Sequence, residues 1–215
     1  MTGRAAPREA PGQRHTGSEM AVSKTKARAL RLETPRLVLA VPDGRDAARM
    51  LAYVEENRGH LEPWEPLRAS SYYALEYWKS ELASAPVEYR AGASMRLILL
   101  PRGDEGGPVL GTANFRNFCR GVFQSCTLGY GLGRAHQGQG LMEEALRAAI
   151  AHVFGELNLH RVMAAHMPRN ERSARLLERL GFAREGLAKD YLRIAGRWED
   201  HVLTSKVNPA WRETG

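Results

Sequence analysis

The feature that most constrains this chain is a glycine-containing turn between an expected strand and a long expected helix. The strand covers 125–132, and the turn runs His136-Gln137-Gly138-Gln139-Gly140. From Leu141 to Leu157 apolar residues recur at helical spacing, which predicts an amphipathic helix with one face in the core. The first amides of a helix lack partners within it and lie at the positive end of its dipole, so they bind anions. The turn therefore predicts a phosphate or pyrophosphate site.

Two common nucleotide sites do not fit this turn. A P-loop requires Lys and then Ser or Thr after its last glycine, whereas Leu141 and Met142 follow Gly140. A Rossmann turn requires a third glycine at the position of Glu143. Nucleoside triphosphates and dinucleotides are therefore excluded, and an ordinary glycine-rich loop stays open as the alternative.

A second segment decides between these interpretations. Residues 161–166 predict a buried strand, 167–170 a turn, and 171–180 a helix that is followed by Gly181-Phe182. The two segments together resemble the GNAT family of acetyl-CoA-dependent N-acetyltransferases, and the resemblance covers about residues 34–207. In that family a glycine turn binds the pyrophosphate of CoA, and an Asn-x-x-Ser helix flanks the pantetheine arm.

The resemblance implies acetyl-CoA as co-substrate and no metal. The residues that match the cofactor-binding positions are Leu132, Gln137, Gly138, Gln139, Gly140, Leu141, Met142, Asn170 and Ser173. Two positions depart from the family pattern. Ala135 stands where a basic or amide side chain is usual, and the neighbouring Arg134 could replace it. Leu177 stands where many relatives carry the Tyr thought to protonate the leaving thiolate.

The likeness is greater to the RimJ type, the ribosomal-protein-alanine N-acetyltransferases. It is carried by residues 56–66, 111–115, 136–142, 189–192 and 196–203. It implies direct acetyl transfer, in a ternary complex, to the N-terminal amine of Ala or Ser in a ribosomal or other protein. A small-subunit ribosomal protein is the expected partner, and association with the ribosome could follow. The residues expected to bind this acceptor are Trp64, Glu65, Tyr191 and Asp200.

Acetyl transfer needs a neutral amine, a donor to the carbonyl oxygen, and a proton or dipole for the thiolate. His166 has an ordinary pKa near neutrality and is a candidate base. Glu65 could hold the substrate ammonium or accept its proton through water. Tyr130 could donate to the acetyl group. Each has a structural alternative: a strand-end hydrogen bond for His166, a solvated loop carboxylate for Glu65, and packing for Tyr130.

The expected fold is an α+β sandwich, a mixed and mainly antiparallel sheet with helices on both faces. In relatives the sheet splays between two central strands, and pantetheine pairs with the exposed edge as an added strand would. Gly129, Gly131 and Gly133 would permit that here. Strands are expected at 36–40, 95–100, 109–115, 125–132, 161–166, 191–194 and 198–207. Helices are expected at 45–56, 70–85, 141–157 and 171–180, with Pro86 bounding the second.

Length and composition favour one globular domain, 34–207, behind a basic tail, 1–30, that we expect to be disordered. Residues 1–36 hold eight Lys and Arg against three acidic residues, and the remainder holds 23 against 21. The net charge of +7 therefore belongs mostly to the tail. Met20 is a second candidate for the natural start. Cys119 and Cys126 do not suggest a disulfide scaffold.

Neither a membrane span nor a secretory signal is visible, so we expect a cytoplasmic protein. Two other functions stay open. One is an acetyltransferase of a small amine, such as an antibiotic or a polyamine. The other, more distant, is a non-enzymatic factor that binds the ribosome or nucleic acid through the tail. No direct function in nucleic-acid binding is expected of the domain itself.

Overall fold

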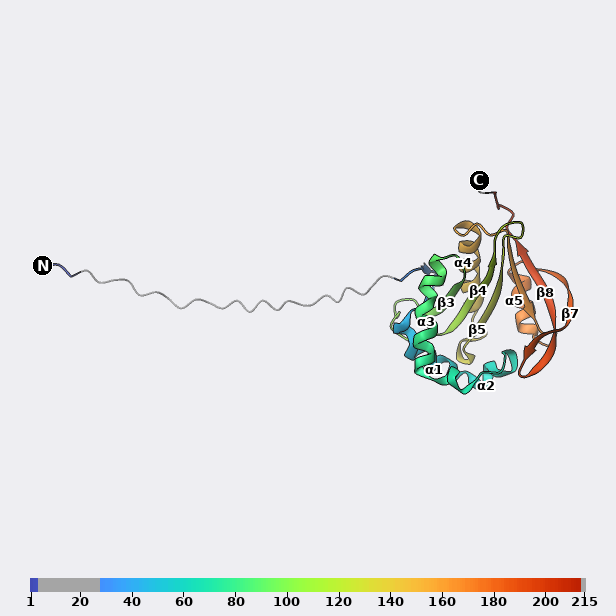
Figure 1. The fold of residues 1–215 in the computed structure, drawn as a ribbon, viewed down its shortest axis with the longest axis horizontal. Coiled ribbons are helices and arrows are strands. Elements are labelled where there is room, and N and C mark those ends of the chain that lie inside the picture. Colours follow the sequence, from blue (N-terminus) through green and yellow to red (C-terminus); the bar gives the residue numbers. More distant parts are fainter. Residues whose placement is uncertain (4–27, 214–215) are drawn as a thin grey trace.

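Eight strands form one mixed sheet in the order β1-β2-β3-β4-β5-β6-β8-β7 (Figure 1). The computed structural model describes residues 1–3 and 28–213. Every neighbouring pair of strands is antiparallel except β5 and β6, which are parallel. The strands are β1 (Arg31–Glu33), β2 (Leu37–Ala40), β3 (Met95–Pro101), β4 (Gly111–Cys119), β5 (Ser125–Leu132), β6 (Arg161–His166), β7 (Ala183–Ile194) and β8 (Arg197–Val207). The predicted α+β fold is confirmed.

Helices cover both faces of this sheet. The α-helices are α1 (Ala47–Glu56), α2 (Arg58–Leu61), α3 (Leu75–Arg90), α4 (Leu141–Gly155) and α5 (Glu171–Arg179). Short 3₁₀ turns are η1 (Gly44–Asp46), η2 (Glu62–Trp64), η3 (Ser70–Tyr73) and η4 (Arg134–His136). The segment from α2 to η3, residues 58–73, is called the arm below. It lies between α1 and α3 in the chain and passes along one end of the sheet (Figure 1).

Alternate residues of the central strands enter two separate cores, because successive side chains of a strand point to opposite faces. Leu39 and Leu97 pack with residues of α4 and α5, such as Leu146. Val38 and Ile98 pack in the other core, with residues of α1 and α3. The sheet therefore has an α4/α5 face and an α1/α3 face, and both faces are buried at β2 and β3.

The sheet splays between β5 and β6, as the family resemblance predicts. The two strands pair only from Ser125 with Arg161 to Leu128 with Ala164. Beyond Leu128 no pairing joins them, although β5 continues to Leu132 and β6 to His166. The second half of β5 therefore keeps its pairing with β4 on one side and exposes its other edge to the gap.

Several element boundaries differ from those predicted. Pro86 lies inside α3 and does not bound it. A proline costs a helix one internal hydrogen bond, but Ala85 before it is buried, and Glu88 in the turn after it bonds Arg96 and Ser94. Ser70–Tyr73 forms a separate 3₁₀ turn before α3. In addition, β1 was not predicted, and β7 begins at Ala183, well before the predicted 191.

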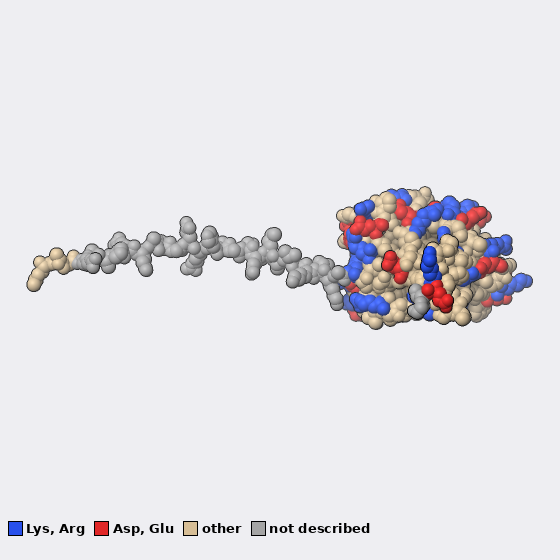
Figure 2. All heavy atoms as spheres, turned by 90° about the horizontal axis from the view of Figure 1, so that it is seen from above, with Lys and Arg blue, Asp and Glu red and all other residues tan. Residues whose placement is uncertain are grey.

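The predicted tail lies mostly in residues 4–27 and Met20 lies there too, so both fall outside the described residues. Arg28 donates to both carboxylate oxygens of Asp46, at 2.7 and 2.9 Å, so contacts with the domain begin before residue 34. On the face shown in Figure 2, basic and acidic side chains are intermixed. Among the described residues no helix is both long and apolar enough to cross a membrane.

Candidate functional site

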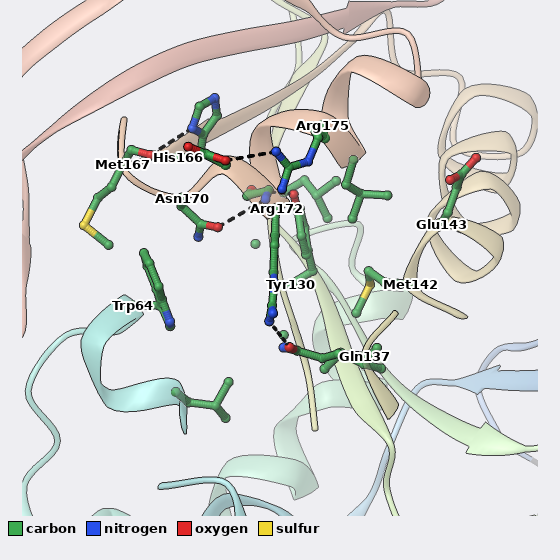
Figure 3. Close-up of a pocket in the computed structure, with 18 of the residues that line it drawn as sticks. Trp64, Tyr130, Gln137, Met142, Glu143, His166, Met167, Asn170, Arg172 and Arg175 are labelled. Carbon is green, nitrogen blue, oxygen red and sulfur yellow. Dashed lines mark hydrogen bonds and ion pairs between the residues drawn. The ribbon is translucent and has the colours of Figure 1, made fainter. Parts of the chain in front are cut away.

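A cavity of about 1130 Å³ opens where β5 and β6 separate (Figure 3). Its volume is at the upper end of the range usual for small-molecule and cofactor sites. The wall is built by β5, the glycine turn, the end of β6, α5, the arm and the hairpin of β7 and β8. The cavity therefore reaches from the first turn of α4 to the arm on the other face of the sheet.

The glycine turn lines this cavity with backbone. Gly138 and Gly140 both have a φ of +75°, a conformation that strains other residues. Gly140 is the N-cap of α4, and no side chain of the described residues caps that helix, so its first amides are available to a ligand. Arg36 braces the turn by donating to the carbonyl of Gln139 at 2.8 Å and to Glu144 at 2.6 Å. The local structure is that of an anion site at a helix N-terminus.

The other residues expected to bind the cofactor lie around this turn, with one exception. Leu132, Gln137, Leu141 and Met142 line the cavity, but the side chain of Gln139 turns back to bond the carbonyl of Ala135. The side-chain amide of Gln137 is engaged on both sides. Its Nε2 lies 2.6 Å from Nε2 of His60, and its Oε1 accepts from Arg172.

The start of α5 brings two polar residues, Asn170 and Ser173, to the splay. Asn170 caps the helix, because its Oδ1 accepts from the amide of Ser173 at 3.1 Å. The hydroxyl of Ser173 lies 2.7 Å from that of Tyr130 on β5. Burial raises the pKa of Tyr130 to about 12, so this phenol stays protonated at neutral pH and can donate a hydrogen bond. Tyr130 and Ser173 thus form a hydroxyl pair beside the free edge of β5.

His166 is buried at the end of β6 and lines the cavity. Its Nδ1 lies 3.0 Å from the carbonyl oxygen of Met167. A carbonyl oxygen can only accept, so Nδ1 of the neutral ring carries the proton. His166 pairs with Val202 of β8. Ala164 packs in the core of the α4/α5 face, and His166 follows it by two residues on the same strand. The ring of His166 therefore lies on the α4/α5 face, beside α5 (Figure 3).

Trp64 and Glu65 are neighbours in the chain, but only Trp64 lines this cavity. The guanidinium of Arg169 lies 5.7 Å from the centre of the Trp64 ring. Glu65 lines a separate, smaller hollow and pairs with Arg68 at 2.9 Å. Its carbonyl oxygen accepts from the amide of Ala195 at 2.9 Å, which joins the arm to the hairpin of β7 and β8. The structure does not bring Glu65 together with His166 and Tyr130.

Tyr191 and Asp200 lie on the hairpin of β7 and β8, and neither lines the cavity. Asp200 accepts a hydrogen bond from the amide of Asp190 at 2.9 Å, across a bulge where Asp190 has a φ of +46°. The half-exposed ring of Tyr191 lies 5.7 Å from that of His201. Both residues therefore support the hairpin behind the cavity wall.

Most of the basic side chains that line the cavity were not predicted from the sequence. Five arginines and two further histidines line it: Arg134, Arg169, Arg172, Arg175, Arg179, His60 and His201. The spacing of Arg172, Arg175 and Arg179 places them along one side of α5, a pattern visible in the sequence. The two histidines had no such signal, because the arm and the hairpin meet only in the folded chain. The described residues contain no cluster of three His, Cys, Asp or Glu that could hold a metal ion.

Comparison with known proteins yields consistent matches. The model of the acetyltransferase (GNAT) domain matches residues 36–183. The chain is 44% identical over 182 residues to the [ribosomal protein uS5]-alanine N-acetyltransferase of Escherichia coli, covering 85% of this chain and 93% of that protein. It is 35% identical over 164 residues to the probable N-acetyltransferase YjcK of Bacillus subtilis, covering 76% and 90%.

Solved structures agree. The ribosomal-protein-S5-alanine acetyltransferase of Vibrio fischeri superposes with a TM-score of 0.81 at 36% identity, covering 86% of this chain and all of that one. The RimJ of Mycobacterium smegmatis, in complex with a CoA-disulfide, superposes with a TM-score of 0.76 at 28% identity, covering 86% and 89%.

Proposed function

Because the chain belongs to the GNAT family of acetyltransferases, we propose that it transfers the acetyl group of acetyl-CoA to the N-terminal amine of a protein. The proposed acceptor is a ribosomal protein that begins with Ala or Ser. The observation that carries this proposal is the cavity at the splay, which connects the glycine turn of α4 with the arm on the opposite face. Such a cavity allows a cofactor on one face and an acceptor on the other to meet between β5 and β6.

The glycine turn and α5 would bind the cofactor. The amides after Gly138 and Gly140 would bind the pyrophosphate of CoA. Arg134 and Arg172 add positive charge at the same wall. The pantetheine arm would then run along the free edge of β5, where it can accept and donate main-chain hydrogen bonds as a further strand would. Asn170 and Ser173 would border that arm.

The proposed chemistry is direct transfer within a ternary complex. A covalent acetyl-enzyme would need an activated nucleophile in the cavity. Neither described cysteine lines it, and burial raises the pKa of Cys126 to about 12, so that thiol stays protonated. The acetyl carbonyl would accept from a backbone amide of β5 near Tyr130. The protonated hydroxyl of Tyr130 is suited to donate toward the departing sulfur or the carbonyl oxygen.

The cavity wall beside the arm would bind the acceptor. Leu61, Trp64, Leu192 and Ile194 line this part of the cavity, so its surface is largely apolar. An apolar wall suits the extended end of a chain with a small first side chain. The relative named for alanine acetylation of ribosomal protein uS5 is matched over most of its length, 93%.

An acceptor panel tests this function. Thiol release from acetyl-CoA would be measured with peptides that begin with Ala, Ser or Leu and with small amines such as polyamines. We expect release with the Ala and Ser peptides and little with the others. Turnover of the small amines alone would reject the protein acceptor, and no thermal shift with CoA would reject the cofactor.

A further inference from the structure

The sheet divides the cavity into a cofactor side and an acceptor side, and strand register assigns each residue to one of them. Tyr130 packs against the core of the α4/α5 face and bonds Ser173 of α5. Its neighbour Gly131 points the other way, where a side-chain carbon would lie 3.4 Å from the hydroxyl of Tyr53 and 3.7 Å from Leu61. The α4/α5 face is therefore the cofactor side, and the face of α1 and the arm is the acceptor side.

His201 lies on the acceptor side. Val202 pairs with His166, whose ring is on the cofactor side, so Val202 shares that face. His201 precedes Val202 by one residue and therefore points to the opposite face, which is the face of Leu61. It lines the cavity although only 4% of its surface is exposed. Of the two histidines at this end of the sheet, His201 is thus the one that faces an incoming amine.

Hydrogen bonding fixes the tautomer of His201. Its Nδ1 lies 2.9 Å from the carbonyl oxygen of Glu199, which can only accept, so Nδ1 carries the proton in the neutral ring. Nε2 then holds a free lone pair, and no described residue forms a hydrogen bond with it. A buried imidazole in this state is a proton acceptor held in one orientation.

Other candidate bases at this wall are already engaged. His60 lies on the arm, but its Nε2 contacts Gln137 at 2.6 Å, and burial lowers its pKa. Glu65 is paired with Arg68 outside the cavity. The carboxylates that line the cavity, Glu143 and Glu171, belong to the first turns of α4 and α5 and so to the cofactor side.

The titratable groups next to His201 come from β7 and β8. Tyr191 lies against it from β7, and Glu199 and Asp200 precede it on β8. The carboxylate of Glu199 is held by Arg169 at 2.6 Å, with Arg197 at 3.8 Å, and hydrogen bonding to Arg169 lowers its pKa. Asp200 is turned to the amide of Asp190. No free carboxylate among the described residues is directed at Nε2.

We propose that His201 is the general base of the reaction, which takes a proton from the ammonium group of the acceptor. This rests on the proposed acetyl transfer but not on the identity of the amine. Nε2 of His201 accepts one proton from the ammonium and later releases it to solvent. The free amine attacks the thioester carbonyl, so a C–N bond forms and the C–S bond breaks. A second proton passes from that nitrogen to the leaving sulfur, which gives the amide and the free thiol of CoA.

The test compares histidine variants of the full chain. Initial rates of thiol release would be measured from pH 6 to 9 with an Ala peptide and with a small amine. His201→Gln should lower kcat/KM for the amine about 100-fold, the usual contribution of a general base, with the KM for acetyl-CoA unchanged. His152→Gln is the matched control, because His152 bonds Tyr89 outside the cavity, and it should keep the activity of the unaltered chain.

A second variant separates chemistry from folding. Added imidazole should raise the rate of His201→Ala at least tenfold and should not accelerate the unaltered chain. The proposal is overturned if His201→Gln stays within threefold of the unaltered chain, if imidazole rescues nothing, or if His166→Gln alone produces the loss. If only the small amine is acetylated, the proposal of a protein acceptor is rejected. The role of His201 is then still tested, by comparing the rates of its variants with that amine.

Discussion

Gly140 combines two requirements that no other residue meets at this position. Its φ of +75° is left-handed, and its amide belongs to the anion site at the start of α4. A non-glycine residue in that conformation costs about 1 kcal/mol. Since Arg36 Nη2 would lie 3.6 Å from an added side-chain carbon, space is not the limit. Substitutions at this position can therefore separate the effect of charge from the effect of backbone strain.

We predict that Gly140→Ala weakens CoA binding modestly and lowers the free energy of unfolding by about 1 kcal/mol. Gly140→Glu should abolish binding, because its carboxylate would lie beside the pyrophosphate and repel it. Isothermal titration calorimetry with CoA measures both, and thermal unfolding confirms that each variant folds. Equal affinity of Gly140→Glu and the unaltered chain would move the pyrophosphate site elsewhere.

Asp46 anchors the chain ahead of β1 to the start of α1. It is buried, accepts from Arg28 and Arg49, and accepts from the amide of Asp43 at 2.9 Å. Desolvation opposes ionisation, but these donors outweigh it and lower the pKa of Asp46 to about 2. A carboxylate whose pKa is lower in the folded chain than in the unfolded chain stabilises the fold above the unfolded value, near 4. That contribution is lost as the pH falls from about 4 to about 2.

We predict that Asp46→Asn lowers the free energy of unfolding by about 2 kcal/mol at pH 7. The difference from the unaltered chain should shrink as the pH is lowered below about 4. Urea unfolding at pH 7, 4 and 3, followed by circular dichroism, measures it. A difference that stays constant over this range would show that Asp46 acts by packing and not by charge.

At the scale of elements, α5 presents a row of arginines to the cavity. Arg172, Arg175 and Arg179 all line it, and together they give one side of a short helix three positive charges. Arg179 is paired with Glu143 at 2.7 Å. Among the described residues Arg175 pairs only with Glu171, and both side chains are well exposed, so that pair contributes little. Arg175 is therefore the member of the row most available to a phosphate of the cofactor.

We predict that Arg175→Gln weakens CoA binding several-fold and reduces its dependence on salt, because one charged contact is lost. Calorimetric titrations at low and physiological ionic strength measure both effects. Arg184→Gln is the matched control, since Arg184 is exposed on β7 outside the cavity. Equal losses in the two variants would attribute the effect to net charge and not to the row on α5.

The elements that the sequence predicted well are those with a strong local pattern. The apolar stripe of α4, the strand pattern of β5 and β6, and the start of α5 all lie close to their predicted bounds. Pro86 was misread because a local rule ended the helix there, whereas the bonds of Glu88 to Arg96 and Ser94 hold the turn beyond it in the helix. Tertiary contacts of that kind leave no periodic signal in the chain.

The same limit explains which site residues were found. The cofactor side is built largely from two continuous segments, 128–142 and 166–173, so the local pattern indicated Gly138 and Gly140, and the family resemblance implied Ser173. The acceptor side joins the arm to a hairpin more than a hundred residues later, through contacts such as that of Ala195 with Glu65. His201 could be assigned to it only from the register of β6 and β8.

At the scale of the whole molecule, the splayed sheet is what makes a two-substrate reaction possible. Two cores hold β2 and β3 on both faces, while β5 and β6 separate beyond Leu128 and Ala164. The chain therefore stabilises a sheet with an opening at its centre. The cofactor and the acceptor can approach this opening from opposite faces, and no covalent intermediate on the protein is required.

The measurement that tests this account most directly is mass spectrometry of a peptide acceptor. The full chain would be incubated with acetyl-CoA and a peptide that begins with Ala and carries an internal Lys, and fragmentation would locate the acetyl group. The account predicts one acetyl group on the N-terminal nitrogen, with one free thiol released for each. A peptide that stays unmodified, or that carries the acetyl group only on Lys, would contradict it.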